Sequence, residues 1–383
     1  MKPHLFFATL AAGGGHVATA RALAQAVERH YPGRFTPIVS DYMSDLGFHA
    51  EDERHKALWR WMLAHPWSAR WGQRLMDRLP TLTNRLHRRT LDAVAKAAAA
   101  HLGALRPALV VANHGWLAVA LTRAQRRYGL RARVLTFATE PLDASALWAE
   151  REAERFVVPS SGALADLVRF GVPEARIDLI GYPVQDAFLH PPAQAQARRA
   201  LGLGDRLTCL VSLGGEGVGR EAQRVVETLA THPTAPQVVV VTGRNAALRE
   251  RLEARGGVHV FGFVDTMAEL VAAADVVVGK AGPASVMEAL AVGRPLLLTA
   301  YAGLNEQKLV RFVKARGFGD FVPTPEALGR SLARYAQPAV RERVFTESRR
   351  LGFDAMTRHL AHYLAAAATQ GFPTRPVRER GLA

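Results

Sequence analysis

The chain has 383 residues, of which 49% are hydrophobic and 22% charged, a balance typical of folded globular proteins and incompatible with wholesale disorder. Its length predicts two or three domains, and its single cysteine, Cys209, excludes an intrachain disulfide and zinc sites built from several cysteines. Lys and Arg number 49 against 34 Asp and Glu, a net charge of +15 that favours anionic partners such as nucleic acid, an anionic membrane or phosphorylated substrates.

The N-terminus passes from a short apolar run at residues 4–10 directly into a glycine-rich loop. It therefore lacks the longer apolar core and the cleavage site of a signal peptide. No apolar run reaches the roughly 18 residues that a membrane-spanning helix needs. We expect a cytoplasmic protein.

Short apolar runs alternate with longer helical patterns along the whole chain, as in βαβ units with parallel sheets. A proline- and alanine-rich stretch at 191–205 predicts a linker between two α/β halves, at 1–190 and 206–340. Helices are expected at 341–368, followed by a disordered tail at 369–383. The predicted strands lie at 4–10, 35–42, 108–114, 132–139, 155–160 and 176–184, and then at 207–215, 237–243, 258–263, 275–280 and 295–301.

Residues 54–90 break this alternation, because they carry nine basic residues against one acidic residue, Asp77. Four of the six tryptophans also lie here: Trp59, Trp61, Trp67 and Trp71. Basic residues mixed with tryptophan are typical of a helix that lies in a membrane interface. Two other interpretations remain: a helix pair packed on its own domain with solvated arginines, and a surface that stacks nucleic-acid bases.

Three glycine-rich stretches follow predicted strands. The first, Gly13-Gly14-Gly15-His16, opens a helix, whose free N–H groups favour an anion and place His16 for proton transfer. The second, at 213–219, suits contact with a diphosphate through backbone amides. Neither has the spacing of a dinucleotide fingerprint or a P-loop. The alternative for the first loop is a merely structural turn with an exposed histidine, and the alternative for the second is tight packing of helix on sheet.

The third stretch joins residues 262–267 to residues 274–290. Within it Ser285 and Glu288 have the spacing of a helix capping box, which would explain both residues structurally.

The run at 258–301 resembles the nucleotide-sugar-binding half of MurG-like glycosyltransferases, in particular the monogalactosyldiacylglycerol synthase and processive diacylglycerol glucosyltransferase branch. The loops at 13–16 and 212–219, together with Gly181-Tyr182-Pro183-Val184 and Thr242-Gly243-Arg244-Asn245, occur in that family's order. The resemblance covers most of residues 1–320.

This resemblance implies a GT-B fold, with two Rossmann-like domains facing each other across a cleft. The C-terminal half would hold a UDP-sugar, the N-terminal half would hold the acceptor, and the sugar would be transferred with inversion and without a metal or other cofactor. His16 is implied as the general base, with Glu140 as a second catalytic residue and Gly14 and Gly15 in the acceptor loop. The implied donor-binding residues are Gly214, Gly215, Phe263, Met267, Gly282, Ser285, Glu288, Asn305 and Glu306.

The sequence departs from the family at two places that concern the substrates. Leu304 stands where the family's donor-sugar motif has glutamine, and a slip of one residue would let Asn305 and Glu306 substitute. Ser145 stands where the diacylglycerol branch has a histidine three residues before the tryptophan, and Glu140 replaces an aspartate.

We therefore expect an inverting hexosyltransferase that acts on a diacylglycerol-type lipid while bound peripherally to the inner face of an anionic membrane, with no nucleic-acid partner. The alternatives are the same fold acting on a soluble acceptor, a nucleotide-sugar epimerase, and a catalytically weakened nucleotide- or lipid-binding homologue.

Overall fold

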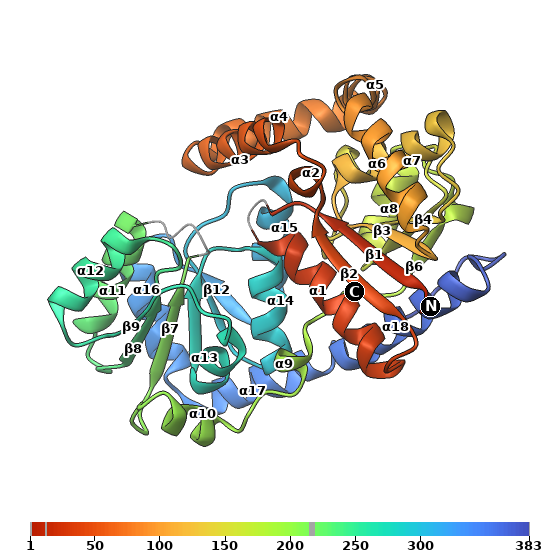
Figure 1. The fold of residues 1–383 in the computed structure, drawn as a ribbon. Helices are drawn as coiled ribbons and strands as arrows, with labels where there is room; N and C mark the ends of the chain where they lie inside the picture. Colours follow the sequence, from red (N-terminus) through yellow and green to blue (C-terminus); the bar gives the residue numbers. More distant parts are fainter. Residues whose placement is uncertain (1, 12–13, 214–218, 383) are drawn as a thin grey trace. The chain divides into compact units, whose positions relative to one another are not determined.

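The computed structural model describes residues 2–11, 14–213 and 219–382, which divide into two compact units (Figure 1). Each unit is built on its own six-stranded parallel sheet. The units do not follow the chain in one pass: unit 1 contains Met1–Gln185, Ala302–Asn305 and Phe353–Ala383, and unit 2 contains Asp186–Tyr301 and Glu306–Gly352.

The sheet of unit 1 has the strand order β2-β1-β3-β4-β5-β6. Its strands are β1 (His4–Thr9), β2 (Thr36–Asp41), β3 (Leu109–Ala112), β4 (Val134–Phe137), β5 (Arg155–Val158) and β6 (Ile177–Leu179). Its helices are α1 (Gly15–His30), α2 (Tyr42–Asp45), α3 (His49–Ala64), α4 (Pro66–Arg78), α5 (Pro80–Thr90), α6 (Asp92–Leu105), α7 (Gly115–Tyr128), α8 (Ser161–Arg169) and α18 (Phe353–Thr369), with the short 3-10 turns η1 (Ala146–Trp148) and η2 (Glu174–Arg176).

Alternation along β1 explains how helices cover both faces of this sheet. Leu5 and Phe7 belong to one buried cluster with residues of α1 and α18, whereas Phe6 and Ala8 belong to another with residues of α6 and α7. Successive side chains of a strand point to opposite faces, so a run that is apolar throughout is buried on both sides. The C-terminal helix α18 thus completes the core of the first unit (Figure 1).

The sheet of unit 2 has the strand order β12-β11-β10-β7-β8-β9. Its strands are β7 (Thr208–Ser212), β8 (Gln237–Val241), β9 (His259–Phe261), β10 (Val276–Gly279), β11 (Leu296–Leu298) and β12 (Gly319–Phe321). The remaining helices are α9 (Asp186–Leu189), α10 (Gln194–Ala200), α11 (Gly219–Ala230), α12 (Ala246–Arg255), α13 (Met267–Ala273), α14 (Pro283–Val292), α15 (Leu304–Ala315), α16 (Pro325–Tyr335) and α17 (Pro338–Arg349).

In both sheets the order of strands reverses beside the first strand of the unit. β1 lies between β2 and β3, and β7 lies between β8 and β10. Ligands of open parallel sheets bind outside the carboxyl ends of the strands at such a reversal. The loops after β1, β3 and β4 in one unit, and after β7, β9 and β10 in the other, are therefore the places to examine for function.

Three sequence-based boundaries differ from the structure. The predicted linker at 191–205 contains α10, which packs on α13. Within α10, Arg198 is buried, and its guanidinium lies 2.6 Å from the Asp275 carboxylate. The helical stretch expected at 341–368 divides between the units, α17 in unit 2 and α18 in unit 1.

The predicted disordered tail is also ordered over its described residues. Arg378 pairs with Leu179 and Leu382 with Ser160 in short β-bridges, and the side chain of Leu382 is buried. The tail extends the edge of the unit 1 sheet, so its backbone groups have partners that a sequence pattern does not reveal.

Candidate active site

The loop after β1 leads into the N-terminus of α1, where Gly14 is the residue before the helix and His16 lies in its first turn. Gly14 has a φ of +78°, a conformation that residues with a Cβ rarely adopt, so glycine is required here to begin the helix abruptly. Gly15 is the first helical residue, and Gly13 lies outside the described residues. This turn brings the half-buried His16 to the carboxyl edge of the sheet.

Thr139 holds the imidazole of His16. Its Oγ1 atom lies 2.8 Å from Nδ1 of His16, and Thr139 itself is buried just after β4. In the tautomer whose Nδ1 donates to Thr139, Nε2 carries the lone pair and is the ring atom that can take up a proton. The contact therefore suits a general base.

A second histidine, His114, lies beside His16, with ring centroids 4.7 Å apart in an edge-to-face arrangement. His114 precedes α7, and its Nδ1 atom accepts a hydrogen bond of 3.1 Å from the backbone N–H of Trp116. Because Nδ1 is an acceptor, neutral His114 carries its proton on Nε2, and it is a donor rather than a base. Sequence analysis missed this residue, although Asn113-His114-Gly115 follows β3 much as the glycine loop follows β1.

Glu140 follows Thr139 and accepts two hydrogen bonds from Ser145, one from the backbone N–H at 2.9 Å and one from the hydroxyl at 3.2 Å. Burial, together with the nearby Asp143 carboxylate, raises the pKa of Glu140 to about 8. At neutral pH the side chain is therefore mostly protonated, and it suits holding the loop at 140–148 in place better than accepting a proton.

Asn113 is fully buried at the end of β3, and neither atom of its side-chain amide has a hydrogen-bond partner within the described residues. The hydroxyl of Thr9, at the end of β1, is also buried without a hydrogen-bond partner among the described residues. Ala8 of β1 pairs with Ala112 of β3, so Thr9 and Asn113 follow paired residues of the two strands. Leaving a buried polar group unpaired costs about 1–3 kcal/mol, so such groups mark sites of function or of bound water. Both lie at the strand ends nearest to α1.

In unit 2 the loop after β10 leads into α14, whose N-cap residue is Gly282 with Pro283 in the first turn. The capping box expected at Ser285 and Glu288 is therefore wrong, because the helix begins earlier, Ser285 is exposed within it, and no side chain caps it. Glu288 lies further along the helix and is half-buried. The capping explanation of these two residues is removed. The N–H of Gly282 itself donates to the carbonyl oxygen of Lys280 at 2.8 Å, and the first turn of α14 beyond Pro283 remains suited to an anion.

Two charged residues stand beside this helix start. Lys280 directly follows β10, and its Nζ atom lies 3.2 Å from Oε1 of Glu306, which is buried in the first turn of α15. Lys280 was not singled out by sequence analysis, although a lysine between a strand and a helix N-cap is a usable signal. Asn305 lies in the same turn of α15 as Glu306 and is half-buried.

Phe263 and Met267 lie after β9. The Phe263 side chain is 60% exposed, and the guanidinium of Arg244 lies 5.4 Å from its ring centroid. Met267 is half-buried at the start of α13. An exposed aromatic ring is costly in water and is a natural platform for a flat base. Gly214 and Gly215 lie outside the described residues.

Residues 49–90 form three successive helices, α3 to α5, with α3 and α4 side by side (Figure 1). Of the eleven large apolar side chains that are exposed among the described residues, eight belong to this segment, which we call the apolar-basic surface. They are Leu58, Trp61, Trp67, Trp71, Leu75, Leu79, Leu82 and Leu86. The side chain of Trp59 is not described.

On α4 the spacing of these side chains is regular. Trp67, Trp71 and Leu75 recur every four residues, so they form one stripe, and Arg70 and Arg74 flank it. Soluble monomers rarely expose so much contiguous apolar surface unless it contacts a partner or a membrane.

Within the described ranges, no helix has both the length and the hydropathy to cross a bilayer. The same residues contain no group of three or more acidic, histidine or cysteine side chains arranged to hold a metal ion.

Residues 208–348 match the glycosyltransferase family 28 C-terminal domain. Across most of its length the chain is similar to monogalactosyldiacylglycerol synthases, which was the resemblance expected from its motifs.

Monogalactosyldiacylglycerol synthase 1 of Arabidopsis thaliana is 24% identical over 344 residues, which are 86% of this chain and 64% of that protein. Among solved structures, the glycotransferase of kitacinnamycin has a TM-score of 0.61 and 16% identity over 97% of this chain and 100% of its own. The UDP-GlcNAc 2-epimerase of Neisseria meningitidis, solved with UDP-GlcNAc, has a TM-score of 0.62 and 13% identity over 97% and 100%. The GT-B fold class predicted from the sequence is confirmed.

Proposed function

We propose that this protein is an inverting glycosyltransferase that moves a hexose from a UDP-sugar to a diacylglycerol-type lipid at the cytoplasmic face of a membrane. The observation that carries the proposal is that one unit contains both His16, held through Nδ1 by Thr139, and the apolar-basic surface. The similarity to monogalactosyldiacylglycerol synthases supports the same acceptor class.

In unit 1 the acceptor hydroxyl would bind near Nε2 of His16. His16 removes the hydroxyl proton as the oxygen attacks C1 of the sugar, while Thr139 accepts the hydrogen bond from Nδ1 and stabilises the imidazolium that forms. His114, as a neutral donor, would orient an oxygen of the acceptor rather than take its proton.

In unit 2 the UDP-sugar would bind at the carboxyl ends of β7, β9 and β10. As the new glycosidic bond forms, the bond between C1 and the phosphate oxygen breaks, and both of its electrons leave with UDP. The N-terminus of α14 at Gly282 and the ammonium of Lys280 would stabilise that negative charge. Glu288 would bind the ribose hydroxyls, and Phe263 would lie against the uracil.

The apolar-basic surface would place the enzyme where its lipid acceptor is. Tryptophan rings favour the headgroup level of a bilayer, and each cation close to an anionic surface adds about 1 kcal/mol of attraction. The Trp67, Trp71 and Leu75 stripe with its flanking arginines has this composition.

A panel of radiolabelled UDP-sugars, offered with diacylglycerol vesicles or with water-soluble alcohols, tests the proposal. We expect label to enter the lipid phase from at least one UDP-hexose and only with vesicles present. Label on the soluble alcohols alone would identify a soluble acceptor. Interconversion of the donor without transfer would identify an epimerase, and UDP binding without any turnover would identify a binding protein.

A further inference from the structure

The apolar-basic surface is connected to the candidate active site through the 3-10 turn η1. Both α4 and α5 contact this turn, and so does α7. The last residue of η1, Trp148, is almost fully buried, with its ring centroid 6.1 Å from that of His16 and 6.4 Å from that of His114. Any displacement of η1 therefore moves a side chain that touches the candidate base.

The first connection is made by Asp77, the single acidic residue in the 54–90 stretch. Its Oδ1 atom accepts a hydrogen bond of 2.8 Å from the backbone N–H of Ala146, the first residue of η1. The residue before it, Ser145, donates to Glu140. One end of η1 is thus held between a carboxylate of α4 and the loop that follows β4.

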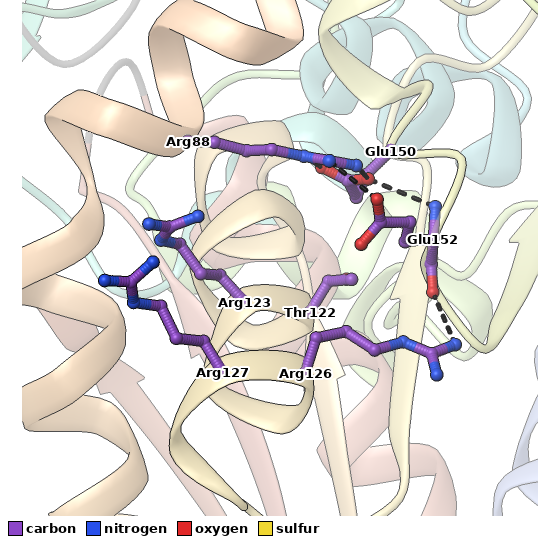
Figure 2. A pocket seen from close by; sticks show the side chains of 7 residues that line it. All are labelled: Arg88, Thr122, Arg123, Arg126, Arg127, Glu150 and Glu152. Atoms are coloured by element: carbon purple, nitrogen blue, oxygen red, sulfur yellow. Dashed lines mark hydrogen bonds and ion pairs between the residues drawn. The ribbon is translucent and has the colours of Figure 1, made fainter.

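The second connection is made by Arg88 of α5, which pairs with residues that follow η1 (Figure 2). Its guanidinium forms an ion pair with Glu150 through two hydrogen bonds, and its Nη1 atom donates to Glu152 at 2.7 Å. Glu150 is completely buried, two residues after Trp148. Figure 2 shows this pair among the side chains that line a pocket, together with Thr122 and three arginines of α7. The pocket has a volume of about 390 Å³.

On its remaining side η1 packs closely against α7. A Cβ at Gly115, the first residue of α7, would lie 2.6 Å from the carbonyl oxygen of Leu147. The turn is thus pressed against α7 while its two ends are held by α4 and α5. It therefore connects the apolar-basic surface to the candidate site.

We propose that Asp77 and Arg88 are positioning residues that transmit docking of α4 and α5 on a lipid surface to the placement of Trp148 beside His16 and of the loop that Glu140 holds. The inference deepens the proposed function and rests on it for its lipid surface. Neither residue contacts a substrate; both act through η1. Docking that immobilises α4 and α5 therefore also immobilises the wall of the site, and turnover depends on the bilayer as well as on the acceptor.

The test is hydrogen–deuterium exchange of the full chain, with and without vesicles of equal parts phosphatidylglycerol and phosphatidylcholine. In the unaltered protein, we expect vesicles to slow amide exchange in α4 and also at residues 145–149. Asp77→Ala should keep the protection of α4 and lose that of 145–149. Asp77→Asn retains an acceptor oxygen and should restore it.

Arg88 needs a paired design, because its removal leaves the buried Glu150 carboxylate without its counter-charge, although the backbone N–H of Glu152 still donates to it. The double variant Arg88→Gln with Glu150→Gln removes both charges, and we expect it to fold and to lose the vesicle-dependent protection of 145–149. Arg85→Gln, on the exposed side of the same helix, is the matched control and should keep it.

Two results would overturn the inference: no vesicle-dependent protection of 145–149 in the unaltered protein, or the same protection in Asp77→Ala. Absence of any vesicle binding would overturn it as well. Transfer to diacylglycerol presented in detergent is measured separately, so loss of the coupling and loss of the proposed transferase activity are distinguishable.

Discussion

The Nδ1 atom of His16 lies 2.8 Å from the Oγ1 atom of Thr139, across 123 residues of sequence. One residue comes from the first turn of α1 and the other from the loop after β4, and both stand at the carboxyl edge of the same sheet. This contact orients the imidazole and fixes which nitrogen faces the threonine. The chemistry proposed for unit 1 depends on it.

Substitution of His16 tests its role as base. We expect His16→Ala to slow transfer by about 100-fold or more, because general-base catalysis contributes on the order of 10²–10⁴. Thr139→Val should have a smaller effect in the same direction, since it removes only the orientation of the ring. UDP affinity, measured by calorimetry, should stay unchanged in both; a normal rate in His16→Ala would place the base elsewhere.

Glu140 predicts a pH dependence of stability. Its pKa is about 8 in the folded protein against 4.5 for the free side chain. Between these values the folded state binds more protons than the unfolded state, so the free energy of unfolding falls as pH rises from about 4.5 to about 8. Urea titrations across this range should show that slope, and Glu140→Gln should flatten it. An equal slope in both proteins would assign it to other groups.

Substitution of Asn113 should affect stability and activity in opposite directions. Its amide is buried without a partner in the described structure, so Asn113→Leu should raise the free energy of unfolding by about 1 kcal/mol while lowering transfer. Denaturant unfolding and initial rates measure the two effects. A destabilised variant would instead show that the amide has a structural partner, such as an ordered water.

The stripe on α4 predicts lipid binding that depends on charge. Replacing both Trp67 and Trp71 by Ser should weaken vesicle binding about tenfold or more, because each exposed ring contributes on the order of 1 kcal/mol when it leaves water. Val168→Ser, at another exposed apolar residue on α8, is the control. Binding by the unaltered protein should fall with added salt and with neutral lipid. Vesicle binding, measured by sedimentation, that changes with neither salt concentration nor lipid charge would contradict a membrane role for this surface.

Ser285 and Glu288 give the sharpest test in unit 2. Since Gly282 and not Ser285 precedes α14, Ser285→Ala should change stability by less than about 0.5 kcal/mol. Glu288→Gln should lower UDP affinity with the melting temperature nearly unchanged. Thermal unfolding and UDP titration of the two variants measure these effects. A Glu288→Gln variant with lower stability but unchanged UDP affinity would show that Glu288 has a structural role only.

Much of this architecture could be predicted from short-range patterns. Apolar runs such as 4–10 and 237–243 are buried on both faces of a parallel sheet, and their loops carry the functional candidates. The position of His16 followed from the same logic, because a glycine loop after a first strand must open a helix at the carboxyl edge of the sheet.

The features that could not be predicted from the sequence depend mostly on contacts between residues that are distant along the chain. His114 gains its role from its neighbour His16, 98 positions earlier, and the pKa of Glu140 is raised because the fold withdraws it from solvent near Asp143. The tail is ordered because Leu382 finds a buried place against the edge of a sheet. The start of α14 at Gly282 was not predicted, because the spacing of Ser285 and Glu288 matches a capping box whose N-cap would lie three residues further along the chain.

Mass spectrometry of the lipids made by a host that lacks glycolipids tests the central claim most directly. On expression of this protein we predict a new lipid whose mass exceeds that of diacylglycerol by one or more anhydrohexose units, and its absence on expression of His16→Ala at equal protein levels. An unchanged lipid profile, with the folded protein present at the membrane, would contradict the proposal that this chain glycosylates a lipid.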